Sequence, residues 1–217
     1  SSFNSGNLIN NTNYPIIVDF AVTPRANPQD GDVFIVRITV NPLPKASIDI
    51  TESSGLVAND KTICSNETAT ITAVPVVGTL IDYEYTWSVP SGMNTPTLNS
   101  SSFKSNIAGQ YNLSLRNIAT GCSSGSITST SLTVTTTPTV GTISSSFNTV
   151  CVNSSIQLEG IGSTGGSTPY IFNWSYSSTS SGPPTTNSST VNVIGVSAGN
   201  SSISYSVLDQ LGCMSSK

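Results

Sequence analysis

Apolar and polar residues alternate in short segments along the whole chain. The pattern is clearest in two sets of aromatic residues at every second position, which are Tyr83, Tyr85 and Trp87, then Tyr170, Phe172, Trp174 and Tyr176. Alternation with a period of two places one set of side chains on a single face of a β-strand. We therefore predict no helix, and strands over residues 16–22, 32–40, 46–51, 68–74, 83–89, 110–116 and 202–208.

One spacing of cysteine and tryptophan occurs twice. Cys64 precedes Trp87 by the same interval as Cys151 precedes Trp174 (87 − 64 = 174 − 151 = 23). A repeated spacing around a repeated strand indicates two copies of one β-domain, and tandem repeats favour a scaffold over an enzyme. Six aromatic residues in phase with this pattern are predicted to lie in the cores: Trp87, Tyr85, Tyr111, Trp174, Phe172 and Tyr205.

Two proline-containing junctions divide the chain into three parts. Residues 1–43 are predicted to be the C-terminal part of a domain, residues 44–136 a complete domain, and residues 137–217 a domain without its last strand. About seven short strands separated by turn residues are typical of a β-sandwich. The expected fold class is therefore all-β, with tandem β-sandwiches of which the first and last are incomplete.

The composition argues against several classes of function. Serine, threonine and asparagine make up about two-fifths of the chain, charged residues only 8%, and the net charge is −4 without any basic run. Nucleic acid and anionic membranes are poor partners for such a surface. No apolar run reaches the length of a membrane span. The chain contains no histidine, which is the commonest general base and metal-binding imidazole. We therefore expect no catalysis, no cofactor and no metal site.

A few residues nevertheless suggest chemistry, and each has a simpler interpretation. Asp82 and Glu84 are candidates for a carboxylate pair, with a solvent-exposed turn and strand as the simpler interpretation. Asp30 and Asp32 are a weak calcium candidate. Ser123 lies in a Gly-x-Ser-x-Gly motif, which we interpret as a hairpin turn because a strand pattern follows it. Two further rings could stack on a sugar but are more simply core residues: Tyr83 and Tyr176.

The four cysteines indicate disulfides in an oxidising compartment, since no Cys-x-x-Cys pair is present. Repeat arithmetic favours Cys64–Cys122 and Cys151–Cys213, one bridge in each domain. Strand geometry disagrees, because Cys64 and Cys122 would lie at opposite ends of an ordinary sandwich. Cys64–Cys213, across the junction of neighbouring domains, fits that geometry. We expect the intradomain pairs first and keep the junction pair as the alternative.

Several short motifs occur in a characteristic order: Cys64-Ser-Asn66, Tyr85-Thr-Trp87-Ser-Val-Pro90, Ala108-Gly-Gln-Tyr111, Thr120-Gly-Cys122-Ser123, Val150-Cys-Val-Asn153, Gly195-Val-Ser-Ala-Gly199 and Gly212-Cys213. Together they resemble the PKD-like and bacterial Ig-like repeats of giant surface adhesins of Bacteroidetes. The resemblance implies immunoglobulin-like sandwiches in proteins exported by the type IX system, including the SprB-like adhesins of gliding cells. The family usually has glycine where Asn66 and Asn153 stand, and asparagine tolerates a left-handed backbone better than other non-glycine residues.

The resulting hypothesis is a non-catalytic stalk or adhesin segment of a large, secreted cell-surface protein. Its expected location is extracellular, and its expected partners are neighbouring repeats, surface polysaccharide or other surface proteins. The alternative is a carbohydrate-binding accessory region of a secreted hydrolase.

Overall fold

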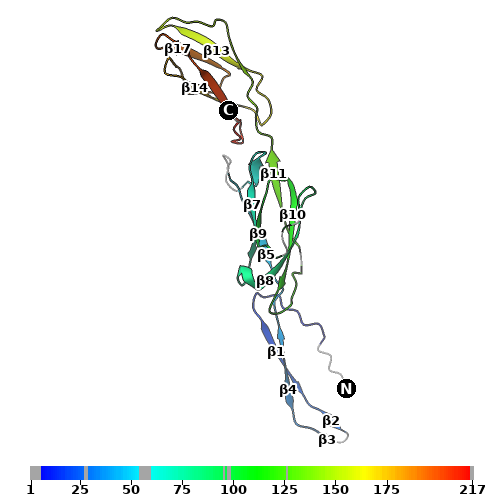
Figure 1. Ribbon diagram of the computed structural model, residues 1–217. Coiled ribbons are helices and arrows are strands. Elements are labelled where there is room, and N and C mark those ends of the chain that lie inside the picture. Colours follow the sequence, from blue (N-terminus) through cyan, green and yellow to red (C-terminus); the bar gives the residue numbers. More distant parts are fainter. Residues whose placement is uncertain are drawn as a thin grey trace. The chain divides into compact units, whose positions relative to one another are not determined.

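The computed structural model describes residues 6–26, 29–53, 60–94, 96, 99–125 and 127–215. Within these residues the regular elements are β-strands and one short 3₁₀ turn, Leu80–Asp82 (Figure 1). No helix in this part of the chain is long and apolar enough to cross a membrane. The all-β fold class predicted from the alternation is therefore confirmed.

The N-terminal strands form a long antiparallel hairpin. β1 (Ile16–Val22) pairs with β4 (Phe34–Val40) along its full length, from Ile16 opposite Val40 to Val22 opposite Phe34. Two short strands, β2 (Arg25–Ala26) and β3 (Gln29–Asp30), pair between them. The strand predicted over 16–22 coincides with β1.

The described residues between 46 and 135 form seven strands in two sheets, which we call the middle sandwich. The strands are β5 (Ala46–Thr51), β6 (Thr62–Cys64), β7 (Ala69–Pro75), β8 (Tyr83–Ser88), β9 (Ser102–Ser105), β10 (Gly109–Asn117) and β11 (Thr128–Thr135). One sheet has the order β6-β11-β10-β8 and the other the order β5-β7-β9. Trp87 of the first sheet meets Phe103 of the second edge to face, with ring centroids 5.0 Å apart, so the aromatic face of β8 points inward.

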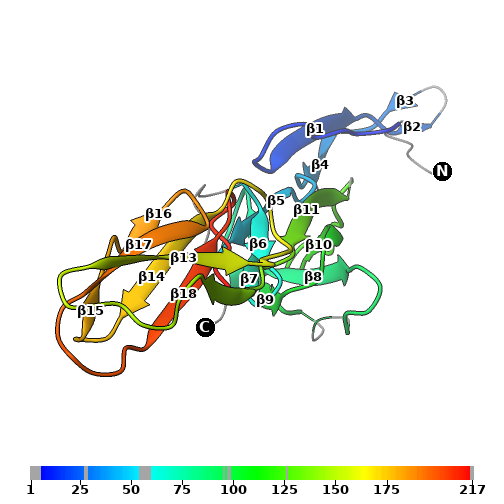
Figure 2. The same ribbon diagram turned by 90° about the horizontal axis from the view of Figure 1, so that it is seen from above.

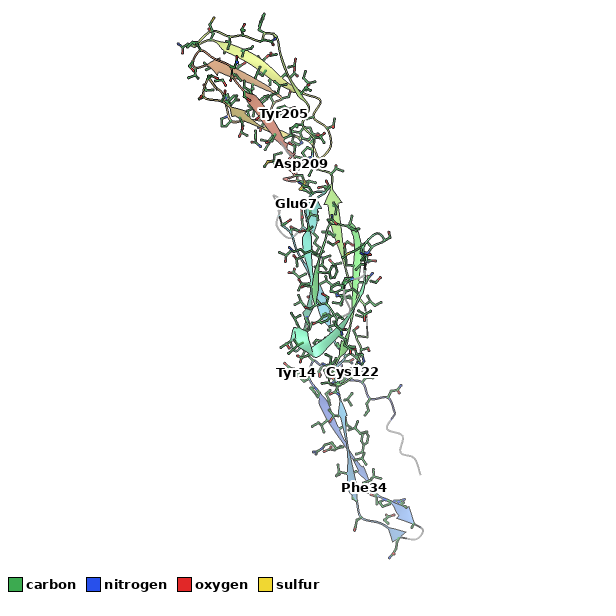
Figure 3. The ribbon with its side chains drawn as sticks, in the orientation of Figure 1. Tyr14, Phe34, Glu67, Cys122, Tyr205 and Asp209 are labelled. Atoms are coloured by element: carbon green, nitrogen blue, oxygen red, sulfur yellow. A yellow bond between two sulfur atoms is a disulfide. The ribbon has the colours of Figure 1, made fainter. Side chains whose placement is uncertain are left out.

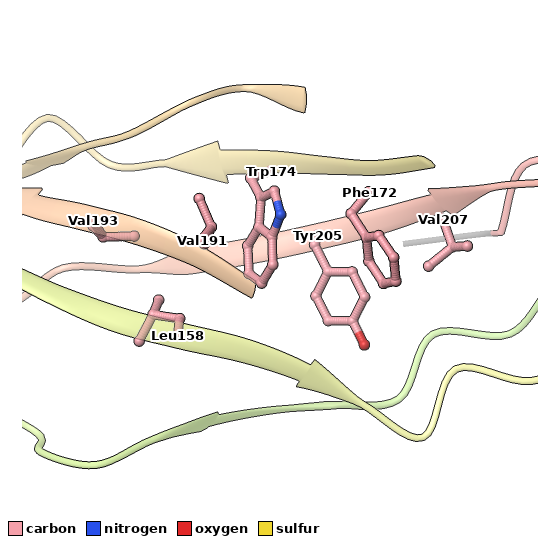
Figure 4. Close-up of a cluster of buried hydrophobic side chains, with 7 residues drawn as sticks. All are labelled: Leu158, Phe172, Trp174, Val191, Val193, Tyr205 and Val207. Atoms are coloured by element: carbon pink, nitrogen blue, oxygen red, sulfur yellow. The ribbon is translucent and has the colours of Figure 1, made fainter. Parts of the chain in front are cut away.

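Seven strands between residues 142 and 208 form the C-terminal sandwich. They are β12 (Thr142–Ser145), β13 (Ser155–Ile161), β14 (Ile171–Tyr176), β15 (Ser180–Ser181), β16 (Thr185–Thr186), β17 (Thr190–Gly195) and β18 (Ile203–Leu208). The sheet orders are β12-β13-β17-β15 and β16-β14-β18. Both sheets contribute to one buried cluster, shown in Figure 4: Leu158, Val191 and Val193 from the first, Phe172, Trp174, Tyr205 and Val207 from the second.

The two sandwiches have the same pattern of strand pairing. The strands concerned are labelled in Figure 2. In the middle sandwich β7 pairs with β9 while β8 pairs with β10, and in the C-terminal sandwich β13 pairs with β17 while β14 pairs with β18. These pairs correspond to strands B with E and C with F of an immunoglobulin-like sandwich. The chain therefore carries tandem Ig-like β-sandwiches.

All six aromatic residues predicted for the cores are buried, with Tyr111 fully inaccessible and Trp174 only 4% exposed. The chain divides into two compact units: residues 1–49, 72–103 and 110–130 form one, and residues 50–71, 104–109 and 131–217 form the other. This division runs through strands β5, β7, β9, β10 and β11. The boundaries expected from the sequence, at residues 43 and 136, therefore stay a prediction.

Candidate functional site: the Cys64–Cys213 junction

A disulfide joins Cys64, in the middle sandwich, to Cys213, in the C-terminal sandwich. Their Cα atoms are 5.6 Å apart, and 149 positions of sequence separate them. Both residues belong to the same compact unit. Both side chains are almost fully covered, with 3% and 1% of their surface exposed. We refer to this bridge as the junction disulfide.

The pairing of β6 with β11 positions Cys64. The two strands run parallel, and Cys64 lies opposite Thr135, the last residue of β11. The chain then turns, because the amide of Glu67 donates to the carbonyl of Cys64 at 3.0 Å. Cys64 therefore lies at the end of the middle sandwich where β11 finishes and the chain continues into the C-terminal sandwich.

A buried aspartate positions Cys213. Asp209 is 1% exposed and follows β18 directly. Its Oδ1 accepts the amides of Leu211 at 3.0 Å and Cys213 at 2.8 Å, and its Oδ2 accepts the amide of Ser167 at 2.9 Å. Three N–H donors on one carboxylate hold the hairpin that carries Cys213 in a fixed shape. Figure 3 shows Asp209 in this hairpin.

Hydroxyl groups surround the junction disulfide. The Oγ1 of Thr135 lies 3.3 Å from the sulfur of Cys213, and the amide of Thr137 donates to the Oγ of Ser65 at 3.3 Å. The amide of Gly166 donates to the Oγ1 of Thr136 at 3.2 Å.

Gly166 has φ +65°, and a Cβ atom at this position would lie 2.7 Å from the Oδ2 of Asp209. Backbone conformation and space thus both require glycine beside Asp209.

The observed bridge corrects the preferred intradomain pairing and matches the alternative. Cys122 lies in the hairpin that leads into β11, whereas Cys64 lies opposite the last residue of that strand. The 8 residues of β11 span about 26 Å, and bridged Cα atoms need to be under about 7 Å apart. Repeat arithmetic failed because the first cysteine of one copy is joined to the second cysteine of the next copy. Cys122, half-buried, and Cys151, exposed, are unpaired.

The other candidates have structural partners. Glu84 pairs with Arg116 at 2.9 Å across the β8–β10 ladder. Asp82 accepts the amide and hydroxyl of Thr79, and these hydrogen bonds hold the pKa of its carboxyl below the usual value. Ser123 lies in the β10–β11 hairpin opposite Arg116, as the hairpin interpretation of its motif predicts.

Asp30 pairs with Arg25 at 3.0 Å, and the described residues contain no group of three potential metal ligands that includes it or Asp32. The ring of Tyr83 is 7% exposed and its hydroxyl donates to the carbonyl of Val77. Tyr176 packs against the C-terminal core, and its hydroxyl donates to the carbonyl of Pro183 at 2.8 Å. Burial raises the pKa of the Tyr176 hydroxyl.

An open groove of about 560 Å³ runs along the C-terminal sandwich. It is lined by apolar side chains, including Ile143, Phe147 and Ile203, and by serine and threonine hydroxyls. None of its lining residues is charged. It lacks the paired carboxylates and the nucleophile with a base that hydrolytic chemistry requires.

Comparison with known proteins gives likeness of fold only. No protein-family model and no curated protein matches the chain. Among solved structures, the eight N-terminal Ig domains of Down Syndrome Cell Adhesion Molecule match at 16% identity and a TM-score of 0.45, over 92% of this chain and 29% of that one. A titin crystal structure matches at 14% identity and a TM-score of 0.42, over 93% and 85% of the two chains. Two domains of the S-layer protein SbsC match at 17% and 0.31, over 75% and 92%. This chain thus spans less than a third of the Down Syndrome Cell Adhesion Molecule structure.

Proposed function

We propose that the chain is a non-catalytic structural segment of an extracellular cell-surface protein. The observation that carries the proposal is the junction disulfide, which joins two successive Ig-like sandwiches covalently. Disulfides persist in oxidising compartments and are rare in the cytosol, which supports an extracellular location.

The position of the bridge gives the segment a mechanical property. A force that pulls the chain from both sides passes from Cys64 to Cys213 through the sulfur atoms. The 148 residues between them (213 − 64 − 1) therefore bear no tension along the backbone, whatever the state of their hydrogen bonds. In an ordinary tandem of Ig-like domains, unfolding of one domain lengthens the chain, whereas unfolding of residues 65–212 adds no length to this segment. Such a property suits a stalk that holds a distal region away from a cell.

The finer assignment follows from the sequence motifs described above. We propose that the segment belongs to a large adhesin that contacts surface polysaccharide or other surface proteins, with gliding motility and type IX secretion as its setting. The burial of Tyr83 and the core packing of Tyr176 do not favour the alternative of a carbohydrate-binding accessory region.

Resistance of cells to shear tests this function. Cells that carry the full-length protein with Cys64→Ser and Cys213→Ser should detach from a coated surface at lower flow than wild-type cells, at equal surface amounts measured by antibody. Ser123→Ala in the same protein, at an exposed hairpin residue, is the matched control for a substitution outside the junction disulfide. Unchanged detachment of the double variant contradicts a mechanical role.

A further inference from the structure

The hairpin that carries unpaired Cys122 repeats the hairpin that carries bridged Cys213. The carbonyl of Cys122 accepts the amide of Asn117 at 2.8 Å, and the carbonyl of Cys213 accepts the amide of Asp209 at 3.0 Å. Asn117 and Asp209 each accept a further amide of their hairpin on a side-chain oxygen, from Thr120 and Leu211 respectively. A glycine with positive φ precedes each cysteine.

The residues that follow these two cysteines also correspond. Ser124 donates its amide to the carbonyl of Leu115 and accepts the amide of Leu115 on its hydroxyl. Ser215 makes the same two hydrogen bonds with Val207. The two hairpins thus share these hydrogen bonds, and one of them holds a disulfide. They differ at the cysteine amide, which donates to the Oγ1 of Thr120 in one hairpin and to the Oδ1 of Asp209 in the other. Figure 3 labels Cys122 and Asp209 in the two hairpins.

The turn that carries unpaired Cys151 corresponds to the turn that carries bridged Cys64. The amide three residues on donates to the cysteine carbonyl at 3.0 Å in both, from Ser154 to Cys151 and from Glu67 to Cys64. Each turn leads into the strand that corresponds to strand B of an Ig-like sandwich, β13 or β7. Each cysteine is also next to a parallel pairing, although with different strands: Ile63 pairs with Val134 of β11, and Val152 pairs with Gly195 at the end of β17.

Each sandwich therefore carries one turn cysteine and one hairpin cysteine, at opposite ends. In the C-terminal sandwich Val152 pairs with Gly195, the last residue of β17, from which a loop leads to the start of β18. Cys213 lies beyond the other end of β18. The observed bridge joins the turn cysteine of one sandwich to the hairpin cysteine of the sandwich that follows it.

We propose that Cys122 and Cys151 form the same disulfide at the two adjoining junctions. Cys122 pairs with the turn cysteine of an Ig-like sandwich that precedes this segment in the full-length chain, and Cys151 pairs with the hairpin cysteine of one that follows. The proposal rests on the function proposed above, because it requires further sandwiches in series.

The surroundings of the two thiols allow such partners. Cys122 lines an open cavity of about 540 Å³ together with Leu8, Ile9 and residues 38–41. Cys151 is exposed to solvent. By contrast, Cys64 and Cys213 are nearly fully covered where their junction is complete. A neighbouring sandwich that seats a turn or hairpin on each open thiol would bury it to the same degree.

The chemistry is an ordinary thiol oxidation. Two thiols lose two protons and two electrons as one S–S bond forms. A thioredoxin-like oxidoreductase in its disulfide form accepts them by thiol–disulfide exchange and leaves as the dithiol. The oxidant that forms the junction disulfide serves equally for the other two bridges.

The consequence is a set of overlapping covalent loops. The loop closed by Cys64 and Cys213 contains both Cys122 and Cys151, so each neighbouring loop begins or ends inside it. Force then passes through the segment by two covalent routes, one from Cys64 to Cys213 and one along residues 122–151. Loss of one bridge leaves a single covalent route, which then bears the whole force.

Disulfide mapping of the full-length protein tests the proposal. The protein is isolated without reductant from the cells that make it, its free thiols are blocked with N-ethylmaleimide, and its non-reduced peptides are identified by mass spectrometry. We expect Cys122 joined to a peptide that precedes residue 1 and Cys151 joined to a peptide that follows residue 217. The Cys64–Cys213 peptide is the internal control, and its absence overturns the proposal as well.

Three further outcomes overturn it: N-ethylmaleimide on Cys122 and Cys151, a Cys122–Cys151 bridge, or a bridge between two copies of the chain. If the Cys64–Cys213 peptide is present in these cases, the proposed function of the segment still stands. Substitution gives an independent measurement. Cys122→Ser and Cys151→Ser should each expose one new reactive thiol outside residues 1–217, and no new thiol contradicts the proposal.

Discussion

The carboxylate of Asp209 accepts the amide of Cys213 at 2.8 Å and is almost fully buried, so the hairpin that presents the disulfide is built on this side chain. A buried carboxylate with three N–H donors makes strong, charge-assisted hydrogen bonds. Its loss leaves those donors without an acceptor.

We expect Asp209→Ala to lower the free energy of unfolding of the C-terminal sandwich by about 2–3 kcal/mol, because each orphaned donor costs about 1–3 kcal/mol before water enters. Urea denaturation followed by tryptophan fluorescence measures the change. Asp209→Asn is the matched control: it keeps one acceptor oxygen and should lose less. A loss below about 0.5 kcal/mol for the alanine variant contradicts the assigned role.

Trp174 stacks on Tyr205 with ring centroids 4.9 Å apart, and its indole N–H donates to the Oγ1 of Thr186 at 3.2 Å. Trp174→Ala should cost about 3–5 kcal/mol, and Trp87→Ala a similar amount. Thr186→Val removes this hydrogen bond and the one that the Thr186 hydroxyl donates to the carbonyl of Ser188 at 2.7 Å, and it should cost about 1–2 kcal/mol. Thermal or urea unfolding of the three variants separates the two contributions. Equal costs for Trp174→Ala and Thr186→Val contradict the packing role of the indole.

The junction disulfide should dominate stability among the cysteines. The chain-entropy model gives about 5 kcal/mol for a closed loop of this size. We expect Cys64→Ser with Cys213→Ser to lower the urea midpoint markedly, while Cys122→Ser with Cys151→Ser leaves it unchanged. The second variant controls for the loss of two cysteines as such. Equal midpoints for the two double variants contradict the prediction.

The alternation of apolar residues predicted the strands because each strand has one buried face. β1 and β5 coincide with the predicted ranges, and β8 lies within one residue of its prediction at the C-terminal end. Burial of the aromatic set on β8 follows from the same period. The partner of each strand in its sheet could not be predicted in this way, because the alternation is the same in every strand and does not say which strands pair.

The junction was harder to predict than the strands for two reasons. A repeat places equivalent cysteines at equivalent positions, and spacing alone does not tell pairing within a copy from pairing across copies. The structural role of Asp209 could not be predicted from the sequence, because a buried aspartate and an exposed one are the same amino acid. The only sequence feature near it was the Gly212-Cys213 motif that follows in the hairpin.

Asn66 and Asn153 stand where the resembling family usually has glycine, and only one of them has the left-handed backbone that asparagine tolerates. Asn153 has φ +65°, whereas Asn66 is not among the residues with positive φ.

The absence of catalysis can be measured directly. With Asp82 bonded to Thr79, Glu84 paired with Arg116, and Ser123 in a hairpin, we expect background rates against ester, peptide and glycoside substrates. The triple variant Asp82→Asn, Glu84→Gln and Ser123→Ala is the control for trace contamination. Turnover by the wild-type chain that the triple variant lacks contradicts the structural role.

The central claim is that the junction disulfide removes part of the chain from extension, and single-molecule pulling tests it most directly. The chain is held at its two ends by handles attached without cysteine chemistry and is stretched until fully unfolded, with and without reductant. Reduction should lengthen the unfolded contour by about 520 Å, from 149 positions at about 3.5 Å each. Cys64→Ser with Cys213→Ser should show the longer contour without reductant. Equal contour lengths in oxidised and reduced wild-type protein contradict the account.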